Sequence, residues 1–434
     1  MRVSGKLIFG ASMILSIVVP VVLLIVLPVW ATLACFVLLI GWLSLTPLGQ
    51  QTWSVAQVGI STIPHRLGAS CVVVVGIAGV VGVFVALLAM GVGLEATLNQ
   101  TGTDDTAIIL ESAAEDEISS VLDHDTASIV AAATAVLKDG ENQPIASTEV
   151  VLVDSVPTGH GGPDTNVEVR GVGAQVWDVR PRIKVISGRK FKAGLREVLV
   201  GKSVLGKIHG IEVGSMLALG GQPWSVAGIF DSGDAHNSEI WGDRDVIGPA
   251  FHHGSSATSE TVRLTDANAF DAFKAEIASN PRLRVSVQTT RQYYSRQSED
   301  LGKAIRILGL SVGAVMAIGA IFGALNTMYA AVAARTREIA TLRAIGFGGV
   351  PVVASLLIET MLLAVAGAAV GTAIAWSIFD GFQGSSMDIS FAFQVSPALL
   401  WDGLKWALAI GLIGGIFPAV RAARMAVTAG LREI

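Results

Sequence analysis

Residues 333–347 read AARTREIATLRAIGF, a short basic, helix-prone segment between two long apolar runs. Its basic residues are Arg335, Arg337 and Arg343. A loop this short and this basic between two membrane spans belongs in the cytoplasm, because loops rich in Lys and Arg are retained on that side. The remaining face, with Ile339, Leu342 and Ile345, is apolar and can dock on a protein partner. The sequence therefore predicts a cytoplasmic helix with a binding face.

The composition indicates an integral membrane protein. Of the 434 residues, 52% are hydrophobic and only 15% are charged, against roughly 25% charged in soluble domains. Residues 95–302 hold 29 of the 35 acidic and 18 of the 30 basic residues, a net charge of −11. This block is too polar for lipid and long enough to bury its own core. Its negative charge argues against nucleic acid as a partner.

Six apolar runs are candidate membrane spans, since about 20 apolar residues cross the hydrocarbon core. They are residues 7–27, 30–45, 70–94, 305–332, 350–379 and 400–420. The first two form a predicted hairpin, and the milder stretch 50–66 is a predicted interfacial helix. The N-terminus resembles a signal peptide, but its apolar stretch is too long, so we interpret it as an uncleaved anchor.

Basic residues near the span ends give the orientation. With six spans, the residues on the cytoplasmic side are Arg2, Lys6, Arg66, Arg335, Arg337, Arg343, Arg421, Arg424 and Arg432. Those at the opposite ends are Lys303, Arg306 and Lys405. The acidic block is then extracytoplasmic. Four spans give the same orientation, because a hairpin adds two crossings.

The polar block has a mixed α/β pattern. The predicted strands are 150–153, 167–169, 197–200, 216–219 and 224–229, the last two joined by a Gly220-Gly221 turn. The predicted helices are 203–209, 266–279 and 288–305, the second with Phe270, Phe273 and Ile277 on one face. We expect the last helix to run unbroken into the following span, as a stalk that couples the polar block to the membrane.

Glycines recur at four-residue spacing in the spans. The pairs are Gly309/Gly313, Gly319/Gly323, Gly367/Gly371 and Gly411/Gly415. Such spacing lets helix backbones approach closely in lipid, which favours a packed, movable bundle or a dimer. The other interpretation is the ordinary composition of membrane helices, in which glycine is common.

Two features resemble chemical sites but do not match the full patterns that such sites require. Gly201-Lys202-Ser203 matches the end of a phosphate-binding loop, but the pattern requires glycine at position 196, which is Arg196. The histidines and aspartates around 231–253 lack a recognised metal-ligand spacing and are predicted as a solvated loop. We therefore predict no catalytic, cofactor-binding or metal-binding residues, and any ATP-driven activity requires a partner chain.

Polar residues inside the spans are a separate feature. Glu359 lies about 13 Å into its span by helical rise, and an unpaired carboxylate there is costly. Asn326 and Thr327 lie in the preceding span. Two interpretations stay open, a polar element in a moving interface and a static hydrogen bond between helices.

The last third of the chain resembles the FtsX-type permease domain. The resemblance rests on Asn326-Thr327-Met328, Arg335-Thr336-Arg337-Glu338-Ile339, Leu342-Arg343-Ala344-Ile345-Gly346, Glu359 and the ending Phe417-Pro418-Ala419-Val420-Arg421-Ala422-Ala423-Arg424. The polar block resembles the periplasmic core domain of MacB-type transporters, through residues 197–202, Gly214, 226–230 and 238–243. Together the resemblance covers about residues 50–434.

This resemblance implies an ABC transporter permease that works by mechanotransmission. Two permeases would pair, as a homodimer or with a second permease, and each would engage a cytoplasmic ABC ATPase that carries ATP and Mg. The implied coupling helix holds Arg335, Arg337, Glu338, Leu342, Arg343, Ile345 and Gly346. Asn326 and Glu359 are the implied intramembrane polar residues, and Pro418, Arg421 and Arg424 form the C-terminal motif. A periplasmic adaptor is a further candidate partner.

The expected fold is an α-helical transmembrane bundle, with four core spans and six in all, carrying a large mixed α/β extracytoplasmic domain on helical stalks. The expected divisions are 1–48, a hydrophobic hairpin of extra spans; 49–94, the interfacial helix and first core span; 95–304, the core domain; and 305–434, the permease domain with its cytoplasmic tail. The chain departs from the family in its extra apolar runs and in lacking a fused ATPase.

The expected location is the bacterial cytoplasmic (inner) membrane, with the lipid bilayer as surroundings. Two other functions remain open. One is an FtsX-like regulator that transmits force to a cell-envelope enzyme, and the other is a membrane-anchored sensor without an ATPase.

Overall fold

The computed structural model describes residues 19–158, 164–386 and 389–425. The chain forms two compact units. The helical unit comprises Met1–Gly91, Ala304–Phe382 and Phe393–Ile434, and the sheet unit comprises Val92–Lys303 and Gln383–Ala392. Most of the first predicted run, 7–27, lies outside the described residues. So do Arg2, Lys6 and Arg432, which entered the orientation argument.

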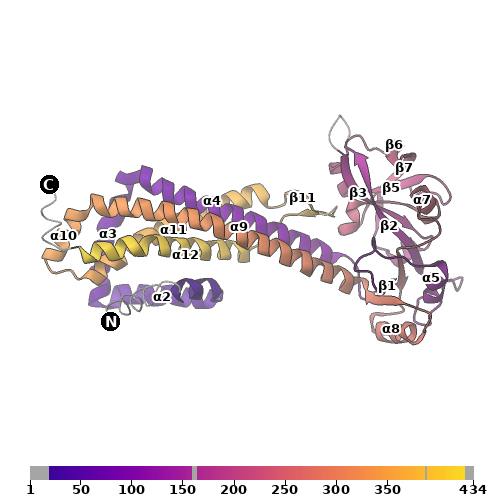
Figure 1. Ribbon diagram of the computed structural model, residues 1–434, viewed down its shortest axis with the longest axis horizontal. Coiled ribbons are helices and arrows are strands. Elements are labelled where there is room, and N and C mark those ends of the chain that lie inside the picture. The colour runs from indigo at the N-terminus through magenta and orange to yellow at the C-terminus, as the bar shows by residue number, and fades with distance from the viewer. Residues whose placement is uncertain (1–18, 159–163, 387–388, 426–434) are drawn as a thin grey trace, which may run out of the picture. The chain divides into compact units, whose positions relative to one another are not determined.

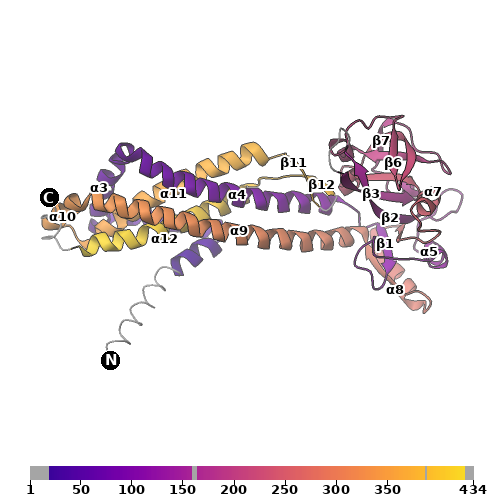
Figure 2. The same cartoon turned by 45° about the horizontal axis from the view of Figure 1, so that its top comes forward.

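Long apolar helices dominate the helical unit. The helices that lie in it or enter it are α2 Val29–Leu45, α3 Pro47–Ser61, η1 Ile63–Arg66, α4 Leu67–Gln100, α9 Thr290–Ala334, α10 Thr336–Ala344, α11 Gly349–Phe379 and α12 Pro397–Arg424. Within the described residues, α4, α9, α11 and α12 are long and apolar enough to cross a membrane. They contain the four later apolar runs of the sequence, and they run side by side in Figures 1 and 2.

The two N-terminal helices of the described chain form a sharp corner. Helices α2 and α3 meet at an angle of 95°, which fits a broken span or a re-entrant loop. Thr46 makes the corner, because its hydroxyl accepts a hydrogen bond from the Gly49 amide at the start of α3. A Cβ on Gly49 would lie within 2.8 Å of backbone atoms of Trp42 and Leu43, so the corner requires glycine. The two additional spans stay a prediction.

Three of the four glycine pairs lie where helices touch. A Cβ on Gly371 of α11 would lie 2.5 Å from the carbonyl oxygen of Ala78 in α4. The pairs at 309/313 and 411/415 likewise face α4 and α11. By contrast, a Cβ on Gly319 or Gly323 would have no atom within 4 Å among the described residues. The packing interpretation therefore holds within this chain for three pairs.

The sheet unit is built on a ten-stranded mixed sheet in the order β10-β1-β9-β2-β3-β8-β5-β7-β4, with β6 paired to β7. Its strands are β1 Thr106–Glu111, β2 Ala146–Pro157, β3 Asp164–Val172, β4 Lys184–Gly188, β5 Glu197–Gly201, β6 Met216–Leu219, β7 Gln222–Asp231, β8 Glu239–Asp243, β9 Ser259–Arg263 and β10 Val285–Thr289. The pairs β3/β8 and β5/β7 are parallel, and the other neighbours are antiparallel. A separate hairpin joins β11 Gln383–Ser386 to β12 Ile389–Ala392.

Short helices cover this sheet. They are α5 His124–Ala131, α6 Val176–Val179, η2 Lys202–Gly206, η3 Ala235–Ser238, α7 Arg244–Ala250, η4 Ala267–Ala269 and α8 Phe270–Ser279. One hydrophobic core lies under α8, where Phe270, Phe273 and Ile277 are buried as the helical spacing predicts. A second core contains side chains of β2, β3, β5, β7 and β8, with the buried Trp224 among them.

Most predicted elements of the polar block are confirmed, with two corrections. All five predicted strands lie within β2, β3, β5, β6 and β7, and Gly220 and Gly221 have φ of +56° and +70°, as a tight hairpin turn requires. The helix predicted at 203–209 is instead a 3₁₀ turn, η2. The helix predicted from residue 288 begins at Thr290, because Gln288 and Thr289 pair with β1. It then continues without a break to Ala334, as expected.

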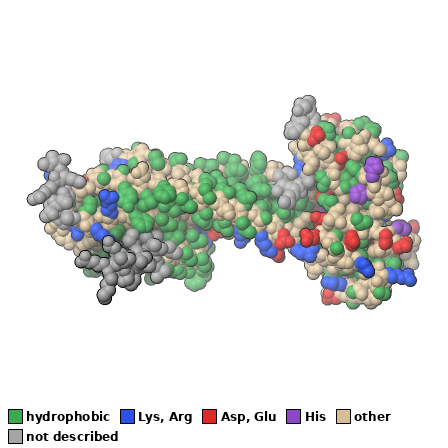
Figure 3. Space-filling model, viewed as in Figure 1, with side chains coloured by type: hydrophobic (Ala, Val, Ile, Leu, Met, Phe, Trp, Pro, Cys, Tyr) green, Lys and Arg blue, Asp and Glu red, His purple; other side chains and the backbone are tan. Residues whose placement is uncertain are grey.

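Charge is segregated between the units in the way the sequence indicates. Figure 3 shows hydrophobic side chains over the visible face of the helical unit, whereas Asp, Glu, Lys and Arg side chains gather on the sheet unit. The interior of the sheet unit also holds charge. Arg170 on β3 is 1% exposed and forms ion pairs of 2.7–2.9 Å with Glu117, Glu149 and Glu239. Burial alone would raise the pKa of Glu149, but Arg180 and Arg170 lower it to about 2.

Candidate functional site

The basic segment forms α10, a separate helix between α9 and α11 at one end of the bundle (Figure 1). Arg335 interrupts the preceding helix, since its φ and ψ of −113° and 14° are not helical. At the other end, Gly346 has a φ of +107°, a conformation that favours glycine. These two breaks set α10 apart as a short helix of nine residues.

One face of α10 packs on its own bundle. Ile339 is 7% exposed and lies in a hydrophobic cluster with residues of α9, α11 and α12. The other buried members are Met328, Val332, Val352, Leu356, Ala419 and Ala422. The sequence placed Ile339 on the face offered to a partner, and that placement is wrong. Ile339 lies four residues after the break at Arg335, and its side chain points into the bundle because α10 packs against α11 and α12.

The opposite face of α10 is open. Arg337, Glu338, Ile345 and Gly346 are exposed, and the isoleucine side chain is 68% exposed. Leu342 is partly buried. Arg343 is also partly buried, and its guanidinium donates a hydrogen bond to the carbonyl oxygen of Met425. The face available to a partner therefore combines Arg337, Glu338 and Ile345.

Arg335 points into the bundle, where it forms what we call the polar junction. Its Nη1 lies 3.0 Å from Oε2 of Glu359 on α11. Its Nη2 donates to the carbonyl oxygen of Val58 at 3.1 Å and to Oγ1 of Thr62 at 2.7 Å, both at the end of α3. Arg335 and Glu359 are both buried. One side chain thus connects α3, α10 and α11.

A glycine makes room for this junction. A Cβ on Gly59 of α3 would lie 3.0 Å from Oε2 of Glu359 and 3.4 Å from Nη1 of Arg335. Such contacts are tight, and the atoms they involve are fixed by an ion pair. Gly59 therefore allows α3 to approach the pair closely enough for Val58 and Thr62 to accept its hydrogen bonds.

The remaining predicted residues take separate places. Asn326 is exposed on α9, and no described contact joins it to Glu359. In the C-terminal motif, Pro418 is buried within α12, and the Arg421 guanidinium lies 5.6 Å from the ring centre of Tyr329 on α9. Arg424 is exposed in the last turn of α12. The structure thus brings together Arg335 and Glu359, but not Asn326.

Sequence reasoning missed the contribution of α3. Gly59 and Thr62 looked like ordinary residues of an amphipathic helix. The available signal was the position of Glu359, because a carboxylate at that depth needs a cation within reach. Arg335 is the first basic residue of the segment between the two spans. The sequence pattern assigned it to the cytoplasmic face, and so its pairing with Glu359 was not predicted.

Comparisons with known proteins match two family models to the chain. Residues 70–280 match the family model described as MacB-like periplasmic core domain. Residues 310–427 match the one described as FtsX-like permease C-terminal. The matches cover α10, α11 and α12 in full and α4 and α9 in part, and they include every strand of the ten-stranded sheet except β10. Helix α3 lies outside both.

Curated relatives carry the same family name. "Macrolide export ATP-binding/permease protein MacB 1" of Aeromonas hydrophila is 26% identical over 295 residues, which is 63% of this chain and 44% of that protein. The MacB protein of Escherichia coli is 24% identical over 403 residues, 88% of this chain and 61% of that protein. The chain spans about half the length of the curated relatives it matches.

Two solved structures are similar to part of the chain. The periplasmic region of MacB from Actinobacillus actinomycetemcomitans aligns with a TM-score of 0.36 and 17% identity, covering 46% of this chain and 94% of that one. The extracellular domain of the transporter YknZ from Gram-positive bacteria aligns with a TM-score of 0.33 and 15% identity, covering 42% and 100%. Because the two family models together match most of the chain, over residues 70–280 and 310–427, the chain belongs to the MacB/FtsX family of ABC transporter permeases.

Proposed function

We propose that this chain is the permease subunit of an ATP-driven transporter in the bacterial cytoplasmic membrane, and that it exports or extracts a substrate on the extracytoplasmic side. Family membership and the four apolar helices support the membrane role. The match of the sheet unit to a periplasmic core domain supports an extracytoplasmic position. It also favours a transporter over an FtsX-like regulator. The relatives are named for macrolide export, which agrees with outward transport.

The exposed face of α10 carries this proposal, because it is the surface that a separate ABC ATPase subunit would contact. Arg337 and Glu338 offer charges of both signs, and Ile345 offers an apolar anchor at the end of the helix. ATP and Mg would bind to the ATPase subunit and not to this chain. Arg335 would act behind this face, since it ties α10 to Glu359 and to α3.

Mechanical transmission is the proposed way in which ATP binding reaches the sheet unit. Helices α4 and α9 each continue from the helical unit into the sheet unit without interruption. They would serve as stalks, because a continuous hydrogen-bonded helix transmits a displacement along its axis. Two permeases would pair around this arrangement, and a periplasmic adaptor would join the extracytoplasmic side.

Co-purification of the chain with its ABC ATPase subunit tests the proposed coupling face. Arg337→Glu combined with Ile345→Asp should lower retention of the ATPase at least tenfold, because a charge is reversed and an apolar anchor is lost. The matched control is Arg306→Glu, which makes the same charge reversal on an exposed residue at the other end of the membrane-spanning part of α9. Equal retention in the double variant and the control would contradict the proposed face.

A further inference from the structure

The sheet unit contains a cavity of about 230 Å³. It lies among β1, β9, the segment around α6, η3 and the first turn of α9. Its lining includes Ile108, Val179, Arg180, Arg182, His236 and Tyr294. A cavity of about 150 Å³ is enough to hold benzene in a protein interior. The space therefore suits a small organic molecule with one ring or a short branched chain.

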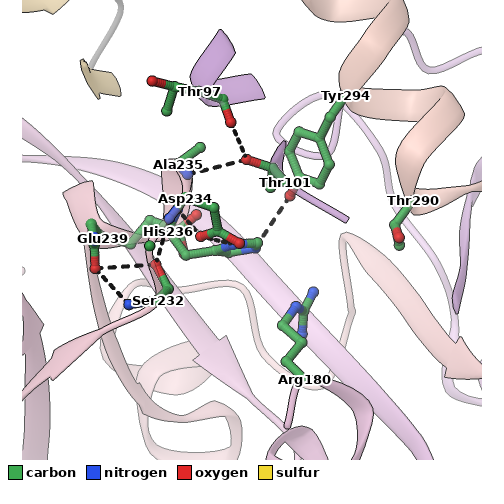
Figure 4. A network of polar contacts seen from close by, with 12 residues as sticks. Thr97, Thr101, Arg180, Ser232, Asp234, Ala235, His236, Glu239, Thr290 and Tyr294 are labelled. Carbon is green, nitrogen blue, oxygen red and sulfur yellow. Dashed lines mark hydrogen bonds and ion pairs between the residues drawn. The ribbon is translucent and has the colours of Figure 1, made fainter. Parts of the chain in front are cut away.

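One wall of the cavity is held rigidly. His236 is 2% exposed, with its Nδ1 3.0 Å from Oδ1 of Asp234 and its Nε2 3.3 Å from the hydroxyl oxygen of Tyr294. Figure 4 shows His236 and Tyr294 pointing toward each other, with Arg180 beneath them. Arg180 forms an ion pair with Glu149. Side chains fixed in this way lose little freedom when a ligand binds, which favours affinity.

The charges around the cavity leave one cation available. Asp105 lies 3.6 Å from Arg263, Asp234 bonds His236, and Arg180 is held by Glu149. Arg182 is exposed at the rim, and no ion-pair partner is found for it in the part of the chain that the structure describes. It also borders a second, more open hollow of about 380 Å³. The charge at the mouth of the cavity is therefore positive.

Apolar side chains also line this cavity. Ile108 and Val179 are buried, Ile183 is partly buried and Pro181 is exposed. Apolar side chains beside an exposed cation match a molecule that has an apolar body and one negative group, since binding pockets combine apolar walls with a few well-placed polar groups. A neutral molecule of the same shape would contact the apolar side chains but would gain nothing from Arg182.

We propose that this cavity binds a small organic anion, a carboxylate on an apolar body about the size of a benzene ring, with Arg182 paired to the carboxylate. The site goes beyond the proposed transport function, because binding there requires no ATPase subunit. It is formed by residues of the sheet unit alone.

The occupant would contact the ends of two long helices. Gly102 and Thr103 follow the last residue of α4, and Thr290 and Tyr294 lie in the first turns of α9; all four line the cavity. These ends are already close to each other, because the Thr103 amide donates to Oγ1 of Thr290 at 2.9 Å. A bound anion would therefore slow the opening of the backbone at residues 102–106 and 290–294.

Ligand-observed NMR on the full chain in lipid nanodiscs tests this site. The probes are benzoate and its neutral analogue benzamide, with empty nanodiscs subtracted. We expect saturable benzoate binding at least tenfold tighter than benzamide binding. Arg182→Gln should weaken benzoate binding at least fivefold, and Arg182→Lys should restore most of it. Lys192→Gln removes a charge from another exposed residue of the sheet unit outside the lining, and it should leave binding unchanged.

Hydrogen exchange with benzoate provides the second measurement. Protection confined to residues 102–106, 179–183 and 290–294 supports the site. The proposal is overturned by any of four results: no saturable benzoate binding, equal binding of benzoate and benzamide, equal effects of Arg182→Gln and Lys192→Gln, or protection only elsewhere in the sheet unit.

Discussion

At the scale of residues, the buried ion pair between Arg335 and Glu359 connects α10 to α11. Removing Arg335 leaves Glu359 without its cation, and removing Glu359 leaves Arg335 with the longer 3.4 Å contact to the exposed Glu338, so we expect each change to cost about 3–5 kcal/mol. We therefore expect Arg335→Met and Glu359→Leu each to lower the free energy of unfolding by about that amount. The double variant should cost clearly less than the sum, because no unpaired charge remains.

Unfolding of the four proteins in mixed micelles of detergent and SDS measures this coupling. Arg337→Met is the control, since it removes an exposed arginine two residues away and should change stability by no more than about 0.5 kcal/mol. Strict additivity of the two single changes would show that the pair contributes nothing as a pair.

Glu260 on β9 gives a second residue-scale prediction, on pH. Burial raises the pKa of its carboxyl from 4.5 to about 8, and one of its oxygens has no hydrogen-bond partner. The folded protein therefore holds this proton more tightly than the unfolded chain does. The stabilising effect is full below pH 4.5 and is lost as the pH rises toward 8. Glu260→Gln should abolish this loss.

Thermal unfolding at several pH values checks the prediction. The melting temperature of Glu260→Gln should match that of the parent near pH 4 and exceed it at pH 8.5, by an amount equivalent to about 1–3 kcal/mol. Glu141→Gln, at an exposed position before β2, should show no such pH-dependent difference. A constant offset between Glu260→Gln and the parent at all pH values would refute the assignment.

The role of Arg335 also shows what the sequence could not predict. Its partners lie 24 residues ahead on α11 and more than 270 residues back on α3. An arginine in a basic loop normally faces water, and no local pattern distinguishes one that turns inward. Glu359 was recognisable as a residue in need of a partner. The partner itself depends on the packing of three helices.

The close contact between α4 and α11 gives a prediction at the scale of elements. A Cβ on Gly371 would lie 2.5 Å from the Ala78 carbonyl oxygen, and a helix backbone cannot yield there without separating the helices. We expect Gly371→Ala to lower the free energy of unfolding by about 1–3 kcal/mol. Gly319→Ala is the matched control, because its new methyl group meets no atom within 4 Å in the described chain. Equal stability of the two variants would show that the contact tolerates a methyl group.

Elements with strong periodicity were predictable from the sequence. The long apolar runs became α4, α9, α11 and α12, and the spacing of Phe270, Phe273 and Ile277 marked α8. The angle between α2 and α3 could not be predicted from the sequence, because that angle depends on the helix cap at Thr46 and on close packing at Gly49. Strand β10 was missed because the helix predicted from residue 288 took in its last two residues, Gln288 and Thr289, which instead pair with β1.

The orientation of the chain across the membrane is a prediction at the scale of the whole molecule. Cys35 and Cys71 are free and exposed, so both are first replaced by serine. A cysteine is then introduced by Lys192→Cys in the sheet unit or by Thr341→Cys on α10, both exposed positions. In spheroplasts, a membrane-impermeant maleimide should label the first variant directly and the second only after lysis. The reverse pattern would exclude the proposed orientation.

The position of α3 affects where the chain can be truncated. Family boundaries place the start of the recognisable region at residue 70, downstream of Val58 and Thr62. A fragment begun there would keep Arg335 and Glu359 but would strip the guanidinium of two of its acceptors. We therefore expect a fragment that begins before Pro47, where α3 begins, to keep these two hydrogen bonds and to be more stable than one that begins at residue 70.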